Sequence, residues 1–80
     1  IKWNDDNMQS TYANVCNVMG TREEIMVLFG SNQSWQGNQE EVEVELSQRI
    51  LLTPYAAKRL QIMLDIGLKE YEKRFGEIKL

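Results

Sequence analysis

Apolar and polar residues alternate most strictly in the middle of the chain, over residues 40–52. Successive side chains of a β-strand point to opposite faces, so this alternation predicts a strand with one buried face and one solvated face. Carboxylates two residues apart could in principle bind a cation, but they are more typical of a solvated face that blocks aggregation. The predicted buried set is Val42, Val44, Leu46, Ile50 and Leu52, and the charged set is Glu41, Glu43, Glu45 and Arg49.

Two shorter segments nearer the N-terminus also predict strands. Residues 11–19 mix β-branched and aromatic side chains with small polar ones, and residues 25–30 form an apolar run that Gly30 ends. Thr21 and Glu24 match a helix capping box, but the apolar run behind them is too short for a helix. We therefore predict a strand over 25–30, and residues 20–24 as the hairpin turn that connects it to the strand over 11–19.

The pattern changes from strand to helix at Thr53-Pro54. A threonine hydroxyl can cap the first turn of a helix, and proline suits the first helical position because it lacks only an N–H that would have no partner. Gly76 supplies a stop signal. These signals predict a helix from Pro54 to about Phe75.

The predicted helix carries two apolar stripes, which together are wider than one sheet usually covers. A turn of about 100° per residue places Lys58, Gln61, Asp65, Lys69 and Glu72 on the opposite, solvated side. Something besides the chain's own sheet should therefore cover the second stripe. The main stripe is Ala56, Ala57, Leu60, Met63, Leu64, Gly67, Leu68, Tyr71 and Phe75, and the second is Tyr55, Ile62 and Ile66.

The remaining segments predict loops. Residues 1–10 show little periodicity and form a loose lead-in, and residues 30–39 are rich in Gly, Asn and Gln around Trp35. Trp35 is either a lid folded onto the edge of the core or a contact for a partner. The whole pattern predicts an α+β fold with a single domain over residues 11–80. In it, a small antiparallel sheet of about three strands is followed by one long C-terminal helix packed on it (βββα).

Composition leaves few chemical roles for the chain. It has 80 residues, no His and one Cys, so an internal disulfide, a structural zinc and a His-dependent nucleophile are all excluded. We expect Cys16 to be a buried small side chain, because nothing nearby would activate it. No spacing singles out a catalytic pair. The sequence therefore predicts no enzyme activity, no catalytic residue, no metal and no cofactor.

Charge and hydropathy exclude two kinds of partner. The net charge of −3 makes nucleic acid an unsuitable partner, and no apolar run approaches the length of a membrane span. The absence of a signal peptide and the lone Cys predict a cytoplasmic protein.

The small size of the chain indicates self-association. An 80-residue core is barely sufficient to stabilise a fold. We therefore predict a homodimer or a dimer of dimers, with Tyr55, Ile62 and Ile66 at the contact and Glu41, Glu43 and Glu45 outside it.

Four stretches carry a resemblance to a known family. They are "YANV" at 12–15, "TREEIMVLFG" at 21–30, "RILLTPYAAKRLQIML" at 49–64 and "YEKRFGEI" at 71–78. With them the chain resembles the short bacterial proteins of domain of unknown function 3467, in which Ser is common at the position of Thr53. That resemblance implies no activity and no site residues.

A second resemblance is to the SecB-type export chaperones, through the junction "ILLTPYAAKR" and the order of sheet and helix. It implies a SecB-like arrangement in a shorter chain. Two functions follow as hypotheses. One is a homo-oligomeric protein-interaction or assembly module, with another protein as a further candidate partner. The other is a SecB-like chaperone that holds unfolded or nascent polypeptides.

Overall fold

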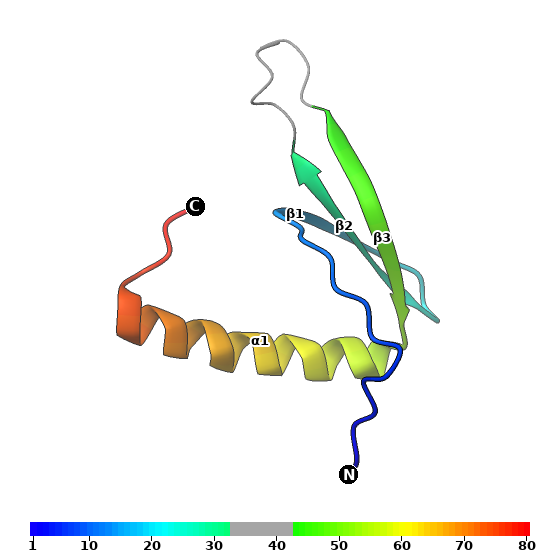
Figure 1. Ribbon diagram of the computed structural model, residues 1–80, viewed down its shortest axis with the longest axis horizontal. Helices are drawn as coiled ribbons and strands as arrows, with labels where there is room; N and C mark the ends of the chain where they lie inside the picture. Colours follow the sequence, from blue (N-terminus) through cyan, green and yellow to red (C-terminus); the bar gives the residue numbers. More distant parts are fainter. Residues whose placement is uncertain (33–42) are drawn as a thin grey trace. The chain divides into compact units, whose positions relative to one another are not determined.

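Three strands and one helix make up the fold, in the order β1 (Val15–Gly20), β2 (Ile25–Asn32), β3 (Val44–Leu52) and α1 (Pro54–Phe75). The computed structural model describes residues 1–32 and 43–80. The strands form one antiparallel sheet in the order β1-β2-β3, so β2 lies in the middle (Figure 1). The predicted βββα arrangement is confirmed.

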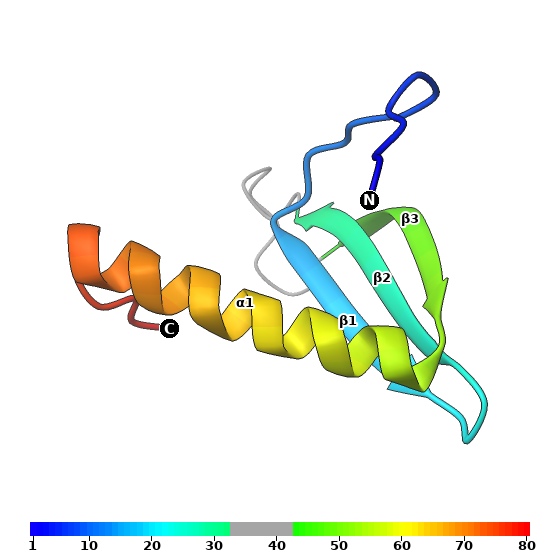
Figure 2. The same ribbon diagram turned by 90° about the horizontal axis from the view of Figure 1, so that it is seen from below.

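The chain divides into two compact units, and every strand crosses from one to the other. The first unit holds 1–17 and 28–49, and the second holds 18–27 and 50–80. The second unit therefore contains the β1–β2 turn, the end of β3 and all of α1 (Figure 2). The expected single domain over 11–80 stays a prediction.

β1 begins four residues later than the sequence predicts. Residues 1–14 contain no strand or helix, and Asn14 explains where the strand starts. Its backbone N–H donates to the Gly30 carbonyl over 3.0 Å, while its side-chain oxygen accepts from the Asn32 N–H over 2.9 Å. A side chain that bonds backbone in this way replaces a rung of the strand ladder.

The connection between β1 and β2 is a tight turn held by Thr21. The Thr21 N–H donates to the Glu24 carbonyl over 2.9 Å, and the Thr21 hydroxyl accepts from the N–H groups of Glu23 and Glu24 over 3.3 Å each. The residues that mimic a capping box thus cap a turn, and no helix follows. The predicted hairpin connection and the strand after it are confirmed, although β2 continues to Asn32.

Gly30 marks the place where β2 lies closest to β3. A Cβ atom there would collide with the backbone carbonyl of Glu45. Next to this point the Ser47 hydroxyl donates to the Phe29 carbonyl over 3.4 Å. Glycine at position 30 is therefore required by close backbone approach rather than by an unusual dihedral angle.

α1 begins and ends where the sequence predicts. Thr53 is extended (φ −66°, ψ 152°), and its hydroxyl accepts from the Ala56 N–H over 3.1 Å, while Pro54 starts the helix. At the other end Gly76 has φ 100° and ψ 166°, and its N–H donates to the Glu72 carbonyl over 2.9 Å. This conformation has a positive φ that glycine adopts most easily, but it is extended rather than left-handed helical.

No apolar side chain among the described residues is buried, and Gly30 is the one buried residue of this part of the chain. The prediction of a buried face on β3 is therefore wrong for the single chain: Leu46 is 56% exposed and Ile50 is 43% exposed. The alternation predicts the two faces of the strand, but whether a face is covered depends on what packs against it.

Candidate functional site: an apolar groove and an exposed helix face

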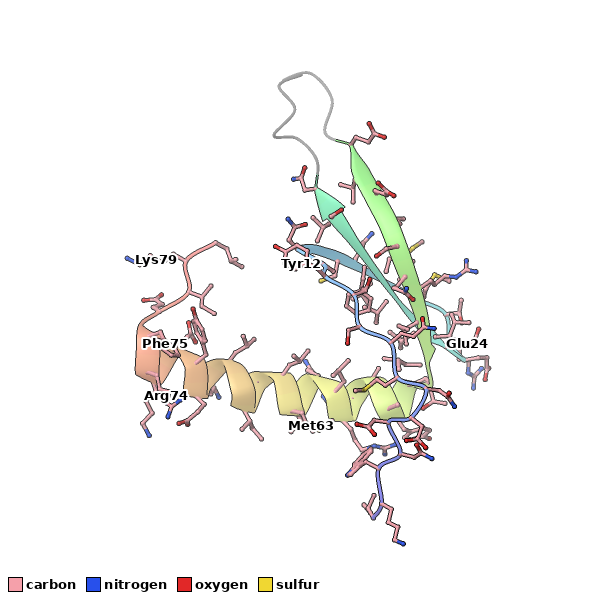
Figure 3. The ribbon with its side chains drawn as sticks, viewed as in Figure 1. Tyr12, Glu24, Met63, Arg74, Phe75 and Lys79 are labelled. Carbon is pink, nitrogen blue, oxygen red and sulfur yellow. The ribbon has the colours of Figure 1, made fainter. Side chains whose placement is uncertain are left out.

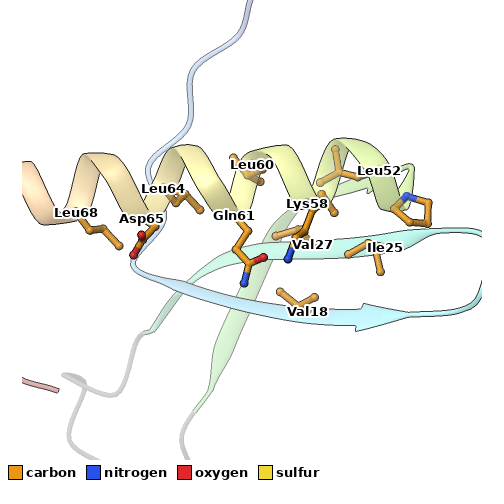
Figure 4. Close-up of a pocket in the computed structure, with 12 residues that line it drawn as sticks. Val18, Ile25, Val27, Leu52, Lys58, Leu60, Gln61, Leu64, Asp65 and Leu68 are labelled. Atoms are coloured by element: carbon orange, nitrogen blue, oxygen red, sulfur yellow. The ribbon is translucent and has the colours of Figure 1, made fainter.

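A groove of about 640 Å³ separates residues 54–68 of α1 from the β1–β2 hairpin, within the second unit (Figure 4). Most of the side chains that line it are aliphatic. Such a concave apolar surface is suited to apolar side chains or ligands. The lining residues are Val18, Ile25, Val27, Leu52, Pro54, Ala57, Lys58, Leu60, Gln61, Leu64, Asp65 and Leu68.

The groove follows from two sequence periods. Ile25 and Val27 are two residues apart on β2 and share a face, and Leu60, Leu64 and Leu68 are four apart on α1 and share a side. Both sets line the space between helix and hairpin (Figure 4). Leu64 is still 54% exposed, so the hairpin approaches the helix without covering it.

The side of α1 that faces the hairpin is rotated from the predicted one. The sequence predicts Lys58, Gln61 and Asp65 on a solvated side opposite the sheet, but they line the groove (Figure 4). Asp65 also forms an exposed ion pair with Lys69 over 3.0 Å. The helix therefore turns less of its apolar surface toward the hairpin than the sequence predicts, which leaves more of it uncovered.

The second candidate surface is the side of α1 away from the groove. Ile62 is 51% exposed, Met63 60% and Ile66 62%, and none of them lines the groove. Met63 projects away from the hairpin (Figure 3). We call this side the open face of α1 and define it by Arg59, Ile62, Met63, Ile66, Gly67 and Glu70.

The structure places the three predicted interface residues on the surface. Ile62 and Ile66 are one turn apart and lie together on the open face. Tyr55 is 77% exposed and lines a separate hollow of about 490 Å³ with Arg22, Glu23, Thr53 and Pro54. The sequence thus predicts the exposure of all three, and their role in a contact stays a prediction.

Three other predicted positions remain, and their outcomes differ. Trp35, the possible lid or partner contact, and Glu41 lie outside the described residues. Cys16 is exposed, so the prediction of a buried thiol is wrong. Its strand is at the edge of the sheet, where the described chain has no further strand to cover it.

The groove itself was missed at the level of the sequence. The sequence predicts Leu60, Leu64 and Leu68 on the main apolar stripe of the helix and Leu52 on a buried strand face, but no space between them. The periodicity shows which residues share a face. It does not show whether two faces meet closely or leave a space.

The described residues offer little for other chemistry. Over 1–32 and 43–80, no three His, Cys, Asp or Glu side chains come together as a group that could hold a metal ion. In the same ranges, no helix has the length and hydrophobicity to cross a membrane.

Fold and surface together define a small βββα protein whose apolar groove and helix face are open to binding. The chain belongs to the family described as "Protein of unknown function (DUF3467)", whose model matches residues 1–80. The resemblance on the four sequence stretches is thereby confirmed. No curated protein and no solved structure matches the chain, so the likeness to SecB-type chaperones has no support beyond its sequence pattern.

Proposed function

We propose that this protein is a homo-oligomeric protein-interaction or assembly module that acts by binding rather than by catalysis. The observation that carries the proposal is the absence of any buried apolar side chain among the described residues. The exposed unpaired thiol of Cys16 favours a reducing compartment such as the cytoplasm.

The exposure of large apolar side chains on α1 supports this proposal. Ile62, Met63 and Ile66 are each more than half exposed. A stable protein–protein contact covers about 800 Å² on each partner, and obligate dimers cover more. All three side chains would lie within one such contact with a second copy.

The proposed contact includes Tyr55, Ile62 and Ile66, because large apolar side chains at such exposure favour burial between subunits. Glu43 and Glu45 stay outside it, since charged carboxylates are costly to remove from water. The same assignment holds for Glu41 as an expectation from the sequence. One isologous patch on each copy is enough for a two-fold dimer.

Sedimentation or light scattering at tens of micromolar tests the proposal. We expect the wild type to be a dimer or larger, and Ile66→Glu to give a smaller species or an unfolded chain. Gln61→Glu is the matched control, because it adds the same charge to the groove side of α1 and should leave the size unchanged. A monomeric wild type, with Ile66→Glu behaving normally, would contradict self-association.

The groove favours a second candidate function, a SecB-like chaperone that holds unfolded or nascent polypeptides. Its apolar lining and its volume of about 640 Å³ suit large apolar side chains of an extended client. This candidate needs the groove to stay open in the oligomer, whereas the assembly module needs only fixed contacts.

An aggregation assay separates the two functions. A holdase should suppress the aggregation of several unrelated unfolded proteins, and Leu64→Glu should abolish this effect while leaving the oligomer intact. An assembly module should suppress none of them. Suppression that survives Leu64→Glu would place client binding elsewhere and remove the groove as its basis.

A further inference from the structure

The open face of α1 carries both apolar and charged residues in a regular order. Reading along the helix, Arg59 comes first, then Ile62 and Met63, then Ile66 and Gly67, and finally Glu70. The spacing of three and four residues keeps all of them on one side. Neither Arg59 nor Glu70 has an ion-pair partner among the described residues.

The order of residues on the open face is complementary to the same face of a second helix that runs in the opposite direction. Around a point between Leu64 and Asp65, reversal of the helix exchanges Arg59 with Glu70, and Met63 with Ile66. Two antiparallel copies would therefore place opposite charges together at both ends and apolar side chains in the middle. Two parallel copies in register would place Arg59 against Arg59 and Glu70 against Glu70, which is unfavourable.

Gly67 fits the same arrangement. Its missing side chain leaves open space: apart from its own stretch of helix, no atom of the described chain lies within 4 Å of where a Cβ would lie. Glycine inside a helix reduces the stability of the helix by about 1 kcal/mol. In the single chain nothing packs against Gly67, so no contact within the chain explains this cost. Reversal about the same point places Gly67 opposite Ile62 of a second helix, where a small residue accepts a large one.

We infer that two copies of this chain associate through a two-fold, antiparallel pair of α1 helices, in which Arg59 of each copy binds Glu70 of the other. Met63 and Ile66 fill the centre of the contact. This inference rests on the proposed self-association and specifies its surface and its direction.

Charge exchange tests the pairing. Arg59→Glu and Glu70→Arg each create two like-charge contacts in the symmetric dimer, and we expect each to weaken dimerisation roughly tenfold or more. The double variant Arg59→Glu/Glu70→Arg has the net charge of the wild type and should dimerise like it. Lys58→Glu makes the same charge change as Arg59→Glu outside the open face, and should have little effect.

Cross-linking tests the direction, in a Cys16→Ser background with a short bis-maleimide. In an antiparallel pair the two copies of position 63 lie about 5 Å apart along the axis, and the two copies of position 73 about 25 Å apart. Met63→Cys should therefore cross-link to itself, and Lys73→Cys should not. Helix content measured by circular dichroism checks that each variant folds.

The outcomes separate this inference from the broader proposal. A monomeric wild type would overturn both. An oligomeric wild type whose size is unchanged by either single charge reversal, or in which position 73 cross-links as well as position 63, would overturn the antiparallel pair and leave self-association standing.

Discussion

Thr53 stabilises the start of α1 with a single hydroxyl. Its oxygen accepts from the Ala56 N–H, one of the first-turn groups that has no partner inside the helix. We expect Thr53→Ala to lower the free energy of unfolding by about 1 kcal/mol, because that N–H loses its acceptor. Thr53→Ser keeps the oxygen and should retain most of the stability. Urea titration of the two variants measures the difference, and equal midpoints for Thr53→Ala and wild type would contradict the assignment.

Gly30 is required for a different reason: a side chain at this position would collide with the neighbouring strand β3. An alanine there would push its Cβ into the Glu45 carbonyl, so the two strands would have to separate locally. We expect Gly30→Ala to lower the unfolding free energy by roughly 1–3 kcal/mol, the usual range for overpacking. Ser31→Ala, one residue further along β2, is the control and should change stability far less. Thermal melts of both variants at one protein concentration would show the difference.

The sequence predicts the bounds of an element where neighbouring residues set them, and not where residues far along the chain do. Both ends of α1 were predicted because the cap, the proline and the glycine stop act within a turn of the residues they control. The start of β1 was missed because it depends on bonds from Asn14 to Gly30 and Asn32, which are far away in the sequence.

The candidate site was predicted only in part, for the same physical reason. Ile62 and Ile66 stand out because they lie beyond the width that one sheet covers. The exposure of Cys16, Leu46 and Leu64 could not be read from the sequence, because a pattern of faces carries no information on whether a second surface covers them.

Gly67 gives an element-scale prediction about α1. Because no described atom outside its own stretch of helix lies near it, Gly67→Leu should raise helix stability by up to about 1 kcal/mol in a dissociated chain. In the paired helices the new side chain would meet Ile62 of the other copy and weaken association. Circular dichroism and sedimentation of the same sample should therefore move in opposite directions. A more helical protein that associates as tightly as wild type would show that nothing packs at this position.

For the whole molecule, association should add to the stability of the fold. Without a buried apolar side chain among its described residues, the single chain has little to offset its conformational entropy. A protein stabilised by a partner melts at a temperature that rises with its own concentration. We expect the melting temperature to rise measurably over a hundredfold range of concentration. A melting temperature that stays constant over this range would indicate a monomer that is stable by itself.

The exposed apolar surface of the single chain also has a consequence for turnover in a cell. Proteases and chaperones act on chains that are unfolded or present apolar side chains, and a small loss of stability changes steady-state abundance several-fold. On the proposed self-association, a copy of this protein that finds no partner would be removed, while a paired copy would persist. Its amount would then be limited by its own synthesis rate, and variants that cannot pair, such as Ile66→Glu, would be scarce even when their genes are fully expressed.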